Sequence, residues 1–103
     1  MELKKINLDI CTAIRRTQEE LKACTNDLVE LEVKATKSQA LVNSLEIKWQ
    51  EEPTEENGAA LDRAYDKHDI VMTMYDDAMD YAEHLEEVLT ALQTANRALK
   101  DII

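Results

Sequence analysis

Residues 45–61 read LEIKWQEEPTEENGAAL, and this stretch lies between two long segments that share the same apolar spacing. Pro53 should end a helix, because the residue before a proline is disfavoured in the α region. Thr54 is a good N-cap, and Glu55 and Glu56 favour the positive end of a helix that follows. The stretch therefore predicts a turn between two helices.

The predicted helices take up nearly the whole chain. We expect the first helix at about residues 3–51, the turn at about 52–57 and the second helix at about 55–103. One Gly, one Pro and no Phe among 103 residues argue against strands and tight turns. The sequence therefore predicts an all-α protein with a single domain over residues 1–103.

Apolar residues recur at a mean spacing of 3.5 on both sides of the turn, as in helices that pack along their whole length. Before the turn, one row is Ile14, Leu21, Leu28, Ala35, Val42 and Trp49, and the other is Ile10, Thr17, Cys24, Leu31, Ser38 and Leu45. After it, the rows are Leu61, His68, Tyr75, Ala82, Leu89, Asn96 and Ile103, and Ala64, Val71, Ala78, Leu85, Leu92 and Leu99. These rows predict a long antiparallel two-helix hairpin of coiled-coil type.

The register of this hairpin follows from the position of the turn. Partners across an antiparallel seam have residue numbers with a constant sum, and a turn centred near residue 55 sets that sum at about 110. The predicted pairs are Ser38 with Val71, Val42 with His68, Trp49 with Leu61, and Ile14 with Asn96. His68 is then either a neutral core histidine with one hydrogen bond or a pH switch. Asn96 resembles a polar seam residue that fixes register or oligomeric state.

The seam leaves further apolar residues outside it. One flank contains Ile6, Ala13, Leu41, Met74, Tyr81, Val88, Ala95 and Ile102, and the other contains Tyr65, Met72 and Met79. A lone hairpin would expose these side chains to water. We therefore expect a partner, either another protein or a second copy of the chain, which would complete a four-helix bundle.

The net charge of −10 belongs to the second half of the chain. Residues 51–103 carry four basic and fourteen acidic side chains, whereas residues 1–50 carry eight of each. The predicted acidic face of the second helix contains Asp62, Asp66, Asp69, Asp76, Asp77, Asp80, Glu83 and Glu87. Such a face repels nucleic acid and membranes and attracts a basic protein, or it simply keeps the protein soluble.

The sequence has no pattern typical of an enzyme. It lacks a Gly-rich phosphate loop, a Cys-x-x-Cys pair and a nucleophile elbow. His84 shares a helix face with Asp77 and Asp80, but no second helix adds inward carboxylates as di-iron bundles require. We therefore expect no catalytic, cofactor or metal site.

The two cysteines do not suit an internal disulfide. Thirteen residues along one helix place Cys11 and Cys24 about 20 Å apart, far beyond the reach of a disulfide. Cys24 lies in the seam as a small apolar residue, whereas Cys11 lies at its edge, where a bridge between chains stays open.

The apolar runs of the sequence bear on where the protein is located. No apolar run approaches the roughly 18 residues that span a bilayer. Residues 1–5 also lack the apolar core of a signal peptide. We therefore expect a cytoplasmic protein, for which export by a non-classical route stays open.

The length near 100 residues, the helical hairpin and Trp49 just before the turn resemble the WXG100-type proteins of type VII secretion. The small helical partners of LXG toxins are similar too. The resemblance implies paired hairpins in a four-helix bundle that act as secreted partners or export adaptors. The sequence departs from the family's Trp-x-Gly motif, because Gln50 and Glu51 follow Trp49 and the single glycine is Gly58.

Two functions fit these features. The first is a non-enzymatic interaction module that acts as a helical partner, adaptor or chaperone, in its most concrete form for a secreted toxin or effector. The alternative is a small acidic inhibitor, of the kind that a phage encodes, whose carboxylate face blocks a nucleic-acid-binding protein such as a nuclease. Its carboxylates recur about every 5 Å along the helix, which is sparser than the charges of duplex DNA at about 1.7 Å.

Overall fold

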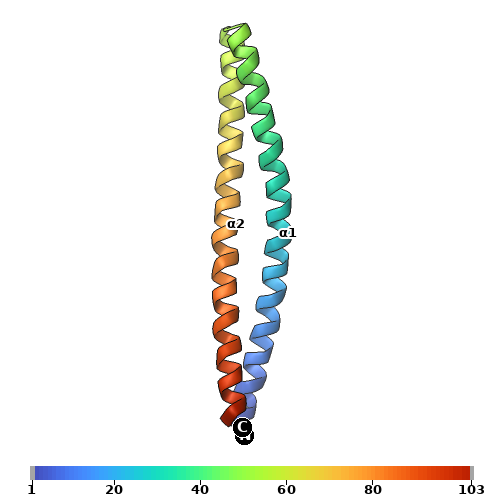
Figure 1. Cartoon of the computed structure of the whole chain (residues 1–103), viewed down its shortest axis with the longest axis vertical. Helices are drawn as coiled ribbons and strands as arrows, with labels where there is room; N and C mark the ends of the chain where they lie inside the picture. Colours follow the sequence, from blue (N-terminus) through green and yellow to red (C-terminus); the bar gives the residue numbers. More distant parts are fainter. Residues whose placement is uncertain (1, 103) are drawn as a thin grey trace. The chain divides into compact units, whose positions relative to one another are not determined.

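The computed structural model describes residues 2–102, which form two α-helices joined by a short turn (Figure 1). Helix α1 spans Glu2–Glu51 and helix α2 spans Glu55–Ile102. No strand occurs among these residues, so the prediction of an all-helical hairpin is confirmed. Ile103, the last residue of one predicted seam row, lies outside the described residues.

The chain divides into two compact units, each of which contains part of both helices. Unit 1 consists of Met1–Asn26 and Met79–Ile103, and unit 2 is Asp27–Ala78, which includes the turn. Within each unit the two helical segments run antiparallel. The single domain over residues 1–103 stays a prediction.

The turn comprises residues 52–54 and is closed by hydrogen bonds at both ends. The amide of Glu52 donates to the carbonyl of Lys48 at 2.9 Å, which completes the last turn of α1. The hydroxyl of Thr54 accepts the amide hydrogen of Asn57 at 3.1 Å, so Thr54 is the N-cap of α2. The Asn57 side chain then donates to the carbonyl of Glu52 at 2.8 Å and ties the two helix ends together.

The predicted register was wrong by about one helical turn. In unit 2, Ser38 Oγ and His68 Nδ1 lie 2.6 Å apart. In unit 1, Cys11 Sγ donates to Asn96 Oδ1 at 3.8 Å. These pairs have sums of 106 and 107 instead of 110. Ser38 thus pairs with His68 and not with Val71, so Val42 is not the partner of His68. Asn96 lies beside Cys11 and not beside Ile14. Trp49 lies beside Gly58 and not beside Leu61.

The short turn explains this difference. Because Thr54 caps α2 directly after Pro53, the turn is centred on residue 53 and the sum of partners falls to about 106. This register places Val42 opposite Ala64 in unit 2, and Cys24 opposite Ala82 in unit 1. All four side chains are buried. A large residue therefore meets a small one at Val42, as close packing of a seam requires.

The buried residues of the described chain belong to the predicted rows. They are Thr17, Cys24, Leu31, Val42, Ala64, Ala82, Leu85 and Leu99. In the row of Val42, the side chains of Ile14, Leu21, Leu28 and Ala35 are half-buried, and Trp49 remains 42% exposed. It lies beside Gly58, where an added Cβ would approach Trp49 Nε1 to 3.3 Å. The glycine therefore leaves room for the indole ring next to the turn.

Candidate protein-binding surfaces

The largest set of predicted partner-binding residues lies along one side of unit 1. This unit 1 flank consists of Ile6 and Ala13 from α1 and Tyr81, Val88, Ala95 and Ile102 from α2. Ile6, Tyr81 and Ile102 are 46%, 49% and 71% exposed. Ala95 is also exposed, whereas Ala13 and Val88 are half-buried. Both helices therefore contribute exposed apolar side chains to this one side of unit 1.

A hydrogen bond across the two helices fixes how the flank is assembled. The hydroxyl of Tyr81 donates to Glu20 Oε2 at 3.0 Å, so this side of α2 adjoins the same side of α1. Glu20 follows Ile6 and Ala13 at seven-residue intervals. The register of unit 1 then places Ala13 beside Ala95 and Ile6 beside Ile102.

The same contact changes the acidity of Tyr81. The hydrogen bond to Glu20, helped by the negative charge of that carboxylate, raises the pKa of the Tyr81 phenol above its ordinary value of 10.0. The phenol therefore stays protonated at neutral pH and can hold its bond to Glu20. Glu20 and the Tyr81 hydroxyl thus form a polar end of the unit 1 flank.

Polar side chains also enter the seam of unit 1. Asn96 accepts the weak hydrogen bond from the thiol of Cys11, which is exposed and in no disulfide. Asn7 Oδ1 is buried and has no hydrogen-bond partner within the described part of the chain. Sequence reasoning missed Asn7, although it precedes Ile14 by seven residues and so extends that row.

The other predicted stripe residues are divided between the units. In unit 2, Leu41 and Met74 are 49% and 50% exposed. Tyr65 is partly exposed and its hydroxyl donates to Glu46 Oε1. Met72 is half-buried, and Met79, which belongs to unit 1, is 37% exposed. The structure thus leaves most of these apolar residues accessible, but only the unit 1 flank gathers six of them in one unit.

A hollow opens beside the seam of unit 2, next to His68. It is lined by Ala35, Thr36, Gln39, Ala40, Asn43, His68 and Met72. Ser38 Oγ lies 3.0 Å from the carbonyl of Ala35, to which it donates its single proton. We therefore assign the ring hydrogen to His68 Nδ1, which donates it to Ser38 Oγ. His68 thus has a hydrogen bond within the seam, as a core histidine requires.

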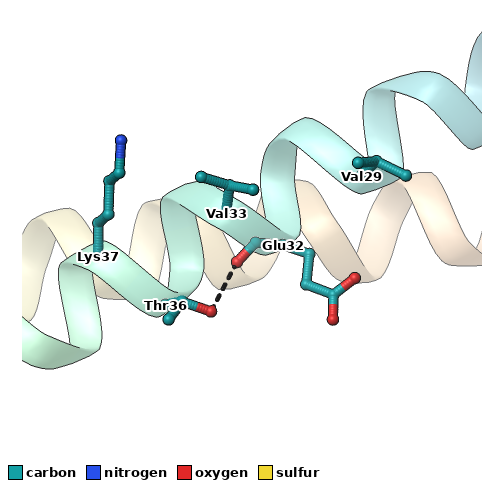
Figure 2. A pocket seen from close by; sticks show the side chains of 5 residues that line it. All are labelled: Val29, Glu32, Val33, Thr36 and Lys37. Carbon is teal, nitrogen blue, oxygen red and sulfur yellow. Dashed lines mark hydrogen bonds between the residues drawn. The ribbon is translucent and has the colours of Figure 1, made fainter.

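A second apolar row on α1 was not predicted from the sequence. This outer stripe consists of Val29, Val33, Thr36, Ala40 and Ile47, all exposed and all in unit 2. Its spacing of four, three, four and seven residues was the signal that would have revealed it. Glu32 and Lys37 border it, and together with Val29, Val33 and Thr36 they line a hollow of about 350 Å³ (Figure 2).

All eight residues of the predicted acidic face are exposed. Charge differs strongly between the units, however. Unit 2 has thirteen acidic and five basic side chains, which give a net charge of −8. Unit 1 has nine acidic and seven basic side chains, which give a net charge of −2. The electrostatic field around unit 2 is therefore the more negative one.

Within residues 2–102, no group of three or more His, Cys, Asp or Glu side chains is placed to hold a metal ion. Neither described helix contains an apolar segment long enough to cross a membrane. No protein-family model matches the chain, and neither curated proteins nor solved structures gave a match.

Proposed function

We propose that this protein is a non-enzymatic interaction module that binds another helical chain through the unit 1 flank. The simplest partner is a second copy, which would complete a four-helix bundle. The observation that carries the proposal is the row of exposed apolar side chains beside a seam whose own side chains are buried or half-buried. Fully burying an exposed Ile side chain contributes about 1.5–3 kcal/mol. Ile6 and Ile102 are 46% and 71% exposed, so a partner that covers them gains the corresponding part of this energy.

The accessible area of the chain supports association. The folded chain exposes 7798 Å². A monomer of 11.8 kDa exposes about 5900 Å² by the usual scaling of area with mass. The difference of roughly 1900 Å² exceeds the roughly 800 Å² that each partner contributes to a standard interface. The chain therefore has enough surface for one such contact.

Charge favours unit 1 as the place of this contact. Two copies that meet through unit 1 bring together net charges of −2, whereas contact through unit 2 brings together charges of −8. Like charges at close range oppose association, and only salt reduces this cost. Self-association through the unit 1 flank is therefore the less repulsive choice.

The role of adaptor or chaperone draws its support from the resemblance to WXG100-type proteins and to the helical partners of LXG toxins. In this role, the flank would hold the apolar face of a secreted toxin or effector in place of a second copy. A bundle with either partner uses the same side chains, so one set of variants tests both.

The test is a pair of matched substitutions at exposed apolar positions. Ala95→Asp puts a charge into the middle of the unit 1 flank, and Val33→Asp puts one into unit 2. Sedimentation velocity should show that Ala95→Asp abolishes association while Val33→Asp leaves it intact, with circular dichroism confirming that both variants are helical. Association that survives Ala95→Asp would exclude the unit 1 flank as the contact.

The alternative function, a small acidic inhibitor of a nucleic-acid-binding protein, is favoured by the net charge of −8 on unit 2. Replacing Asp69, Asp76, Asp77 and Asp80 together by Asn separates the two functions. If the protein is an inhibitor, the variant should no longer bind a basic target such as a nuclease. Association through apolar side chains should persist in the same variant.

A further inference from the structure

We propose that the outer stripe of α1 is a second docking surface, which binds an amphipathic helix of a different protein with cationic side chains along its edges. This surface lies in unit 2 and shares no residue with the unit 1 flank. The proposal therefore stands independently of self-association.

The spacing of the outer stripe identifies its occupant as a helix. Positions 29–47 cover about 27 Å of α1, and their steps of four, three, four and seven residues keep them on one face of the helix, with the polar Asn43 between Ala40 and Ile47. Val29, Val33 and Ile47 remain 58%, 48% and 58% exposed. Helix α1 thus has one row that packs in the hairpin and a second with helix-packing spacing that faces solvent. A helix laid along this second row would bury it through anchors at i, i+3, i+4 and i+7.

Thr36 does not interrupt this row, although its side chain is polar. Its hydroxyl donates to the carbonyl of Glu32 at 3.0 Å (Figure 2). The hydroxyl is therefore satisfied within α1, and the methyl group remains for contact with a partner. The small side chain of Ala40 follows one turn later and allows close approach.

Charge complementarity selects a cationic partner over a second copy. Glu32 borders the stripe on one edge, and Glu30, Lys37 and Lys48 follow the other. In any orientation, a second copy on this stripe would set two units of net charge −8 against each other. A helix edged with Lys or Arg gains attraction from the same field.

The test uses two synthetic amphipathic peptides of about 18 residues with identical Leu seams. One has Lys at the seam-edge positions and the other has Glu. Fluorescence anisotropy with the full chain should show binding of the Lys peptide, at least tenfold weaker binding of the Glu peptide, and weakening of Lys-peptide binding by added salt.

Variants locate the binding site. Val33→Asp and Val29→Asp should each weaken Lys-peptide binding at least tenfold. Ile70→Asp, which changes a similarly exposed side chain of unit 2 on α2, should leave it within twofold. Ala95→Asp should also leave it unchanged, so failure of the proposed self-association would be seen separately.

Several results would overturn the proposal. They are no binding of the Lys peptide, equal binding of both peptides, or binding that Val33→Asp and Val29→Asp do not weaken. A fourth is a fall in the sedimenting mass of Val33→Asp relative to the unchanged chain, which would make the outer stripe an interface between copies.

Discussion

The Tyr81–Glu20 contact makes the ionisation of one phenol a probe of the unit 1 flank. Because the folded pKa is raised, the bond contributes stability that is complete below pH 10 and is lost as the pH rises through the higher folded pKa. We expect Glu20→Gln to lower the pKa of Tyr81 toward its ordinary value, since the charged acceptor is gone. A titration of the tyrosine ring-carbon NMR shifts measures this.

Glu19→Gln is the matched control, because Glu19 is an exposed neighbour that does not contact Tyr81 in the described hydrogen bonds. It should leave the midpoint of Tyr81 unchanged. An identical midpoint in Glu20→Gln and the unchanged chain would mean that the contact does not persist in solution.

Asn7 offers a second prediction at this scale. Its Oδ1 atom is buried without a partner in the described structure, which costs about 1–3 kcal/mol. The register places Asn7 opposite Leu99, so Asn7→Leu should raise the free energy of unfolding by about 1–2 kcal/mol. Urea denaturation measures the change, with Asn26→Leu at an exposed position as the control. A loss of stability in Asn7→Leu would show that the amide is paired in solution.

Single residues were predictable from the sequence where burial follows the heptad rows. Val42, Ala64 and Leu85 are buried because their rows meet across the hairpin. The outer stripe was missed because Thr36 and Ala40 look like ordinary surface residues. In the structure, the Thr36 hydroxyl is bonded to the carbonyl of Glu32, which leaves its methyl group for contact with a partner.

At the scale of the helices, the cap of α2 should contribute measurable stability. Thr54 accepts the amide hydrogen of Asn57, and loss of such a cap costs about 1 kcal/mol. Thr54→Ala should therefore lower the free energy of unfolding by about this amount. Thr94→Ala, at an exposed position in the C-terminal part of α2, should leave it unchanged or slightly higher because alanine favours helix. Equal effects of the two substitutions would mean that the cap does not form.

The register of the helices can be tested by a double-mutant cycle. Ser38 and His68 share a hydrogen bond at 2.6 Å, so Ser38→Ala and His68→Ala should couple by about 0.5–1.5 kcal/mol in chemical denaturation. The register predicted from the sequence placed Ser38 opposite Val71 instead. Additive effects of the two substitutions would contradict the pairing of Ser38 with His68.

The helices themselves were predictable, whereas their register was not. Pro53 marks the end of α1 clearly, but Asn57 and Gly58 also look like turn residues. In the structure, Asn57 instead reaches back from the first turn of α2 to the carbonyl of Glu52. Because α2 begins directly after Thr54, the turn is centred two residues earlier than predicted, and every pair along the seam moves with it.

For the whole molecule, the division of charge separates two kinds of association. Unit 1 is nearly balanced and has an apolar flank, whereas unit 2 combines a net charge of −8 with the outer stripe. We therefore expect contact between copies to use unit 1 and contact with cationic helices to use unit 2. Added salt should weaken only the second, because it screens opposite charges.

Sedimentation equilibrium of the unchanged chain, from low to high micromolar concentration, tests the proposed association most directly. The chain has a mass of 11.8 kDa. The proposal predicts that the average mass rises with concentration toward twice this value, as burial of the unit 1 flank requires. A single species of 11.8 kDa across the whole range would contradict self-association through this flank.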